Sequence, residues 1–328
     1  MNVAAFFPTS GPKVLVSFPV LKEVRAYIES RCEVMFNETG ATLSPDELVR
    51  RAHGHNVLMI TTTDRLDAHT LGRLPSEIRV IATYSVGHDH IDLPACQARG
   101  LTVINTPDVL TDAVAEVAMF LMIGAARRGT ESIALLRSRH WPGWSPIQLP
   151  GMQLTGKRLG IFGMGRIGRA LAHRAQAMGM SIHYANTRRL GPELEAGATY
   201  HHGITELLRA SQFLALTCPS TPQTRQFLNE ERLKLLPPGS ILVNVARGDV
   251  VEDEALIAAL VSGHVAAAGL DVFAQEPHLH PRYFELPNVF MTPHIGSSTV
   301  EARIAMAVAL LDALDELAQG LNPLNRLV

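Results

Sequence analysis

A glycine-rich turn between an apolar strand and an alanine-rich helix is the feature that most constrains the fold. The turn reads Gly163-x-Gly165-x-x-Gly168. In this context the first glycine permits a tight turn, the second lets the backbone approach a pyrophosphate, and the third lets the helix pack on the strand. The helix that begins here would offer free N–H groups to phosphates. The sequence therefore predicts a dinucleotide site, with a purely structural glycine turn as the alternative. The other residues expected at this site are Met164, Arg166 and Ile167.

Short apolar runs alternate with helical patterns on both sides of this turn. Strands are expected at 13–17, 57–61, 80–83, 101–105, 157–162, 181–185, 213–216, 241–244, 267–271 and 289–291. Long helices are expected over about 111–128 and 299–319, with an irregular stretch over 137–150 that holds both tryptophans. Strands that alternate with helices predict an α/β fold with parallel sheets covered on both faces.

Composition excludes several classes of protein. The content of 47% apolar and 18% charged residues is that of a globular protein, and a formal charge of −2 provides no general field for nucleic acid or anionic membrane. The three cysteines are far apart and have no metal-ligand spacing, which favours reduced thiols in the cytoplasm. The N-terminus lacks the pattern of a signal peptide, and the longest apolar run is shorter than the roughly 20 residues of a membrane span. We expect a cytoplasmic protein with no metal, nucleic-acid or membrane partner.

An amide and two arginines follow the second strand after the glycine turn. Asn186 lies about 20 residues past the glycines, where this fold usually carries an Asp or Glu that binds the adenosine ribose. An amide removes a charge that would repel a 2′-phosphate by about 4 kcal/mol at about 4 Å and an effective dielectric near 20. Arg188 and Arg189 add planar donors that match a phosphate. The segment predicts NADP(H) binding, whereas the alternative is that both arginines are ordinary surface residues.

Three further motifs lie after successive strands in the second half of the chain. NVARGDVV contains Arg247, GLDVFAQEP contains Asp271 and Glu276, and TPHIGSS contains His294. Open α/β sheets bind ligands beyond the carboxyl ends of their strands. Beside a nicotinamide, such an arginine could bind the carboxylate of a 2-oxo acid, and the imidazolium could donate a proton to its carbonyl oxygen. The glutamate would orient the imidazole and favour its charged form.

These motifs closely resemble those of the D-isomer-specific 2-hydroxyacid dehydrogenases. The resemblance extends over nearly the whole chain, including SVGHDHIDL at 85–93 and NTPDVLTDAVAEVAM at 105–119. It implies that Arg247, Glu276 and His294 form the catalytic trio, and that Arg247 and His294 also contact the substrate. It further implies that the backbone at Val86 and Gly87 holds the substrate carboxylate. Cofactor contacts are expected from Thr111, Cys218, Pro219 and Asp271.

The same resemblance implies two doubly wound parallel-sheet domains. A Rossmann-type cofactor domain over 107–295 would be inserted in a flavodoxin-like substrate domain made of 1–106 and 296–328, with the active site in the cleft. It also implies a homodimer in which the region of Trp141 lies in or near the neighbour's site. Within the family the chain is most similar to the glyoxylate/hydroxypyruvate reductases. It departs from them at Thr187, often an arginine, and at Thr217, a histidine in many members.

The sequence therefore predicts an NADPH-preferring reductase of glyoxylate and hydroxypyruvate that yields D-2-hydroxy acids and uses NAD less efficiently. Bulkier 2-oxo acids such as hydroxyphenylpyruvate or 2-ketogluconate would use the same trio. A dinucleotide-sensing binding protein of the same fold is the alternative from another class. His88 and His90, which lie beside the expected carboxylate loop, could suggest a metal site, but we expect none. Tyr84 is a candidate to narrow the pocket or to bind a substrate hydroxyl.

Overall fold

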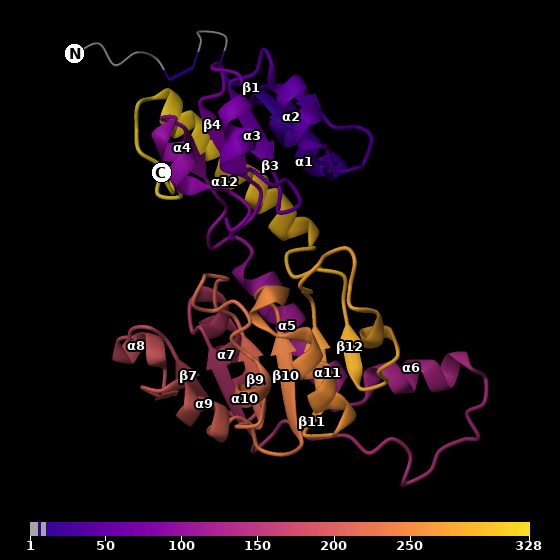
Figure 1. Cartoon of the computed structure of the whole chain (residues 1–328). Helices are drawn as coiled ribbons and strands as arrows, with labels where there is room; N and C mark the ends of the chain where they lie inside the picture. The colour runs from indigo at the N-terminus through magenta and orange to yellow at the C-terminus, as the bar shows by residue number, and fades with distance from the viewer. Residues whose placement is uncertain (1–5, 8–10) are drawn as a thin grey trace. The chain divides into compact units, whose positions relative to one another are not determined.

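The computed structural model describes residues 6–7 and 11–328, so most of the N-terminal segment tested above for a signal peptide lies outside the described residues. The chain divides into two compact units (Figure 1). Unit 1 consists of Met1–Leu110 and Ser297–Val328, and unit 2 is the continuous segment Thr111–Gly296. Among the described residues, no helix combines the length and the apolar character that a membrane crossing requires.

Unit 1 is built on a five-stranded parallel sheet with the order β2-β1-β3-β4-β5. The central strands β3 and β4 are buried along their whole length, which explains their continuous apolar sequences. The strands are β1 (Lys13–Val16), β2 (Glu33–Phe36), β3 (Val57–Ile60), β4 (Val80–Thr83) and β5 (Thr102–Ile104). The helices are α1 (Lys22–Glu29), α2 (Pro45–Ala52), α3 (Ala68–Arg73), α4 (Leu93–Ala98) and α12 (Val300–Ala318).

Helix α12 returns to unit 1 after the whole of unit 2 and packs against α1. Arg31, just after α1, forms ion pairs with Asp312 at 2.8 Å and with Asp315, both on α12. The helix begins at a capping residue, because the hydroxyl of Thr299 accepts a hydrogen bond from the N–H of Ala302 at 3.1 Å. The first turn of α12 is therefore fixed by its cap, and the helix is fixed to the rest of unit 1 by ion pairs.

Unit 2 is built on a seven-stranded parallel sheet with the order β12-β11-β10-β9-β6-β7-β8. The strands are β6 (Arg158–Phe162), β7 (Ser181–Ala185), β8 (Thr199–Tyr200), β9 (Phe213–Leu216), β10 (Ser240–Asn244), β11 (Val265–Leu270) and β12 (Val289–Met291). The α-helices are α5 (Thr111–Ala126), α6 (Gly129–Arg137), α7 (Arg166–Ala177), α8 (Pro192–Glu195), α9 (Ile204–Ala210), α10 (Glu230–Leu233) and α11 (Asp253–Val261). Two short 3₁₀ helices, η1 (Gly248–Val250) and η2 (Pro281–Phe284), complete the unit.

The strand order reverses beside β6, which places a topological switch point at the glycine turn. From β6 the chain passes through α7 to β7 on one side, and later returns to β9 on the other side. Helices α5 and α7 contact each other over the sheet, while α10 contacts both α9 and α11. The predicted fold class, α/β with two parallel sheets, is confirmed.

One local prediction was wrong in detail, and one strand of unit 1 was not predicted. The helix expected over about 111–128 ends at Ala126, because Arg128 adopts a left-handed conformation with φ of 54° and a second helix, α6, starts at Gly129. The ion pair between Arg128 and Glu131, at 2.6 Å, holds this break. Strand β2 was not predicted, since it is an edge strand whose residues are mostly not buried and give no apolar run.

Candidate active site

The glycine turn of unit 2 has the geometry of a pyrophosphate cradle. Gly163 has a φ of +97°, and a Cβ there would lie 2.6 Å from the backbone of Cys218. At Gly168 a Cβ would lie 2.8 Å from the carbonyl oxygen of Gly163, so the helix packs closely on the turn. At Gly165, by contrast, a Cβ would meet no atom of the described chain within 4 Å. This open approach beside the N-terminus of α7 fits a dinucleotide phosphate.

Asn186 binds the glycine turn itself. Its side-chain oxygen accepts a hydrogen bond from the N–H of Met164 at 2.6 Å, and its side-chain nitrogen lies 3.4 Å from the carbonyl oxygen of the same residue. The hydroxyl of Thr217 donates to the carbonyl of Gly163 at 2.7 Å. The amide at the end of β7 thus helps to hold the turn in shape, a contact that the sequence did not indicate.

The two arginines after β7 have different surroundings. Arg189 forms a double contact with Glu195, at 2.8 Å and 3.1 Å. Glu195 is buried and also accepts a hydrogen bond from the hydroxyl of Tyr184 at 2.6 Å. The hydrogen bonds from Arg189 and Tyr184 hold the pKa of Glu195 below its usual value. Arg188 is exposed and has no carboxylate partner among the described residues, so its guanidinium is the more available of the two.

Arg247 follows β10 in a turn that Asn244 shapes. The buried side chain of Asn244 accepts from the N–H of Ala246 and donates to the carbonyl of Arg247, both at 3.0 Å. A Cβ at Gly248 would lie 1.8 Å from the carbonyl carbon of Phe273. Only glycine therefore allows the turn of Arg247 to pack on the segment that leads to Glu276.

Glu276 and His294 form a hydrogen-bonded pair. Nδ1 of His294 lies 2.7 Å from Oε2 of Glu276, while Oε1 accepts a hydrogen bond from the N–H of Phe273 at 2.9 Å. Burial by itself would raise the pKa of the Glu276 carboxyl. The hydrogen bond and charge of His294, the Phe273 N–H and the charge of Arg247 outweigh burial and hold that pKa below its usual value.

Asp271 supports the turn that carries His294. Its buried carboxylate accepts three hydrogen bonds, from the hydroxyl of Thr292 at 2.6 Å and from the N–H groups of Ile295 and Gly296 at 2.8 Å each. His294 has a φ of 53°, an uncommon conformation for a residue other than glycine. Within the described residues, the Asp271 carboxylate thus makes its hydrogen bonds to this turn. The family resemblance implies a further contact, with the cofactor.

Val86 and Gly87, in unit 1, present backbone donors. Their carbonyl oxygens accept hydrogen bonds from the side chains of Asn105 at 3.0 Å and Ser85 at 2.6 Å. Within the described residues, the N–H groups of Val86 and Gly87 donate to no protein acceptor. Such N–H groups are suited to bind a carboxylate.

The remaining predicted residues lie around the glycine turn or begin helices. Thr111 is the first residue of α5, and Arg166 is the exposed first residue of α7. Cys218 is buried against Gly163, while Pro219 next to it is exposed. In the part of the chain that the structure describes, no group of three or more His, Cys, Asp or Glu side chains is arranged to hold a metal ion.

Two buried side chains support the turns of the candidate site, a role that the sequence did not indicate for either of them. Asn244 and Asp271 are polar residues, each 1% exposed, at or just beyond the end of an apolar strand. A buried polar group at a strand end needs hydrogen-bond partners, and here these partners are the turns that carry Arg247 and His294. The Glu276 carboxylate, the His294 imidazole and the Arg247 guanidinium lie on adjoining turns. Together, such groups can bind an anion and transfer a proton.

Comparison with known proteins finds similar sequences and structures among the dehydrogenases and reductases of 2-hydroxy and 2-oxo acids. Residues 119–296 match the NAD binding domain of the D-isomer specific 2-hydroxyacid dehydrogenases. A glycerate dehydrogenase of Hyphomicrobium methylovorum is 44% identical over 313 residues, which are 95% of this chain and 97% of the relative. A glyoxylate reductase of Pyrococcus furiosus is 41% identical over 301 residues, 90% of this chain and 89% of the relative. The solved structure of an NADPH-dependent glyoxylate/hydroxypyruvate reductase of Sinorhizobium meliloti, in complex with NADP and malonate, is similar with a TM-score of 0.86 at 31% identity, covering 97% of each chain.

The lowered pKa of Glu276 predicts a pH-dependent contribution to stability. The folded-state pKa lies below the unfolded value of 4.5, so the ionised carboxylate stabilises the fold above about pH 4.5, and this contribution is lost as pH falls through the folded-state pKa. Glu276→Gln should therefore lower the urea midpoint at pH 6, and the difference from wild type should shrink towards pH 3.5. Glu193→Gln, an exposed carboxylate on α8, is the control. A difference that stays constant with pH would contradict the interpretation.

Proposed function

The chain belongs to the D-isomer specific 2-hydroxyacid dehydrogenase family, and from this premise we propose that it is an NADPH-preferring reductase of small 2-oxo acids. The expected substrates are glyoxylate and hydroxypyruvate, and the products are D-2-hydroxy acids. The observation that carries the proposal is the Glu276–His294 pair at 2.7 Å, on a turn next to that of Arg247. The names of the relatives, glyoxylate reductase and glycerate dehydrogenase, support the substrate class.

The proposal gives each residue of the trio one task. Arg247 binds the substrate carboxylate together with the N–H groups of Val86 and Gly87, and its charge polarises the carbonyl. With Nδ1 of His294 held by Glu276, Nε2 is the nitrogen that donates a proton to the carbonyl oxygen. Glu276 stabilises the imidazolium before transfer. The bound nicotinamide supplies the hydride that reaches the carbonyl carbon.

The cofactor preference follows from the end of β7. A carboxylate at position 186 would repel a 2′-phosphate, and Asn186 does not. Arg188 is the arginine best able to bind that phosphate, because Arg189 is already paired with Glu195. The NADP in the related structure from Sinorhizobium meliloti is consistent with this preference. Unit 2 would hold the cofactor and unit 1 the substrate carboxylate.

The proposal also includes a cytoplasmic location and a homodimeric assembly. The three cysteines, Cys32, Cys96 and Cys218, are free thiols, as expected for a cytoplasmic protein. Helix α6 and the segment after it extend away from the sheet of unit 2 (Figure 1), and their exposed apolar side chains support a homodimer. Leu136 is 61% exposed and Trp144 82% exposed, values that suit an interface better than a monomer surface.

The direct test is the initial rate of NADPH and NADH oxidation with glyoxylate and with hydroxypyruvate. We expect a higher kcat/KM with NADPH than with NADH. Arg188→Ala should raise the KM for NADPH about tenfold, the loss expected for a charge-assisted contact with phosphate, and leave the KM for NADH nearly unchanged. Arg209→Ala, an exposed arginine of α9, is the control. Equal effects on both cofactors would remove Arg188 from cofactor selection, and a preference of the wild type for NADH would refute the NADPH assignment.

Loss of the imidazole should slow the chemical step. His294→Ala is expected to lower kcat by roughly 10²- to 10⁴-fold, as for the loss of a positioned general acid. Binding of NADPH, followed by its fluorescence, should change little. An unaltered kcat would exclude His294 as the proton donor, whereas loss of cofactor binding would indicate a structural role.

The proposed dimer depends on the apolar surface of α6 and its extension. Leu136→Asp combined with Trp144→Ser should convert a dimer to a monomer in light scattering after size exclusion. Phe284→Ser, which replaces an apolar side chain that is 69% exposed on η2, is the matched control and should leave the dimer intact. A wild-type protein that elutes as a monomer at micromolar concentration would contradict the proposal.

A further inference from the structure

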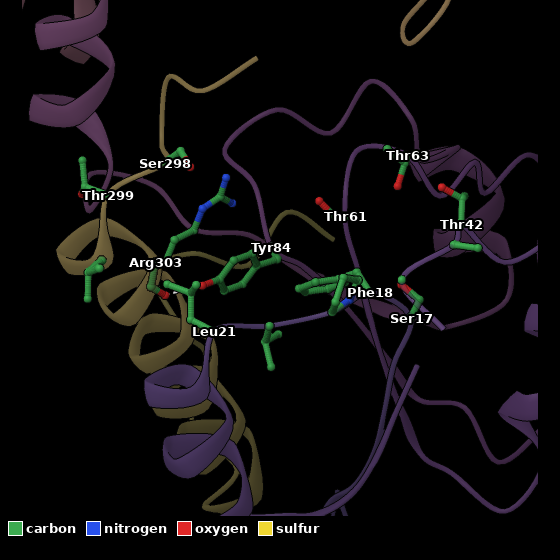
Figure 2. Close-up of a pocket in the computed structure, with 15 residues that line it drawn as sticks. Ser17, Phe18, Leu21, Thr42, Thr61, Thr63, Tyr84, Ser298, Thr299 and Arg303 are labelled. Carbon is green, nitrogen blue, oxygen red and sulfur yellow. Dashed lines mark hydrogen bonds between the residues drawn. The ribbon is translucent and has the colours of Figure 1, made fainter. Parts of the chain in front are cut away.

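Unit 1 contains a pocket of about 650 Å³ at the carboxyl edge of its sheet. Its walls come from the segments that follow β1, β2, β3 and β4 and from the start of α12 (Figure 2). This is the edge of a parallel sheet at which α/β proteins bind ligands. Neither glyoxylate nor hydroxypyruvate, with two and three carbon atoms, would fill a space of this size.

The wall of the pocket combines hydroxyl-bearing and apolar side chains. Its apolar side chains include Phe18, Leu21 and Val300. Among the described residues that line the pocket, none is acidic. The hydroxyl-bearing side chains include Thr42, Thr61, Thr63 and Ser298.

Arg303 is the basic residue of this wall. It lies in the first turns of α12, and in Figure 2 its guanidinium extends from the helix towards the side of Ser298. The ring of Tyr84 lies 5.8 Å from the guanidinium carbon, and the hydroxyl of Tyr84 donates to the carbonyl oxygen of Arg303. Both contacts fix the position of the arginine without neutralising its charge.

Among the described residues, Arg303 has no carboxylate partner, unlike two other half-buried arginines of unit 1. Arg31 on the same unit is half-buried and paired with two aspartates of α12, and Arg51 is paired with Glu47. Arg303 is half-buried too, but within the described chain it pairs with no acidic side chain. Burial lowers the pKa of its guanidinium, which nevertheless stays charged at neutral pH. A partly desolvated charge without a counter-ion favours the binding of an anion.

Two carboxylates adjoin the wall in sequence: Glu301 is exposed, and Asp64 is already satisfied. Asp64 is buried, and its Oδ2 accepts hydrogen bonds from the hydroxyl of Ser17 at 2.6 Å and the N–H of Thr61 at 2.9 Å. Asp64 thereby fixes two residues of the wall. It does not supply the missing partner of Arg303.

We propose that this pocket binds the second carboxylate of a 2-oxo dicarboxylic acid, with Arg303 as the residue that recognises it. Val86 and Gly87 follow Tyr84 in the chain within two and three residues, so the wall of the pocket and the proposed carboxylate loop are at most about 11 Å apart along the backbone. In the proposed complex, one carboxylate of a five-carbon diacid would bind at that loop and the other would enter the pocket. The inference rests on the proposed reductase function and adds a larger substrate class to it.

The test compares two acids with the same five-carbon chain, 2-oxoglutarate and 2-oxopentanoate, which lacks the second carboxylate. The wild type should have a kcat/KM for 2-oxoglutarate about ten- to a hundredfold higher than for 2-oxopentanoate, as expected for a charge-assisted contact. Arg303→Gln should bring this ratio to about one, and Arg303→Lys should give an intermediate ratio. Arg79→Gln, an exposed arginine at the opposite end of β4, is the matched control and should leave the ratio unchanged.

The outcomes separate this inference from the reductase proposal. A wild-type ratio of one or less, or a ratio that Arg303→Gln does not change, would overturn the diacid pocket while glyoxylate reduction stands. If no 2-oxo acid is reduced, the reductase proposal fails, and calorimetric titration with glutarate decides the pocket by itself. Glutarate binding that is lost in Arg303→Gln supports the pocket, and binding that is absent or equal in both proteins refutes it. Melting temperatures verify that each variant is folded.

Discussion

The buried carboxylate of Asp271 is the interaction on which the geometry of the candidate active site depends. It lies just past the end of β11 and accepts three hydrogen bonds from the turn that follows β12. These bonds join two neighbouring strand ends and hold His294 in its left-handed conformation. Because His294 is held there, its Nδ1 meets Glu276, and Nε2 remains for another partner. A buried charge would be costly without these donors, so the same contacts satisfy Asp271 and define the site.

The glycine turn of unit 2 is also held in shape by contacts from neighbouring strand ends. Gly163 lies against Cys218, Gly168 lies against Gly163, and Gly165 alone faces open space. Asn186 adds a hydrogen bond to the backbone of the turn from the end of the next strand. The cradle is therefore rigid on the protein side and accessible on the ligand side, which reduces the entropy that a bound phosphate must lose. The amide at position 186 thus helps to hold the turn in shape.

In unit 1 the carboxyl edge of the sheet carries two kinds of group that we propose to bind anions. The N–H groups of Val86 and Gly87 are neutral donors, whereas Arg303 is a charge held by its aromatic neighbour Tyr84. Backbone donors recognise a carboxylate by geometry and accept any acid that carries one. A half-buried guanidinium discriminates among those acids, because leaving it without an anion costs more inside the pocket than in water.

The sequence by itself determined the alternation of strands and helices, the glycine turn, and the presence of Arg247, Glu276 and His294 at successive strand ends. These are local patterns, since apolar runs, glycines and polar strand ends can be read within a few residues. Only the tertiary structure decided that Asp271 holds the turn of His294, that Glu195 pairs with Arg189, and that Arg303 faces a pocket. Each of these depends on partners from separate segments, and the strand order that unites them is set by packing. A pattern along the chain predicts which groups are present, but burial and pairing in three dimensions decide which of them remain available to a ligand.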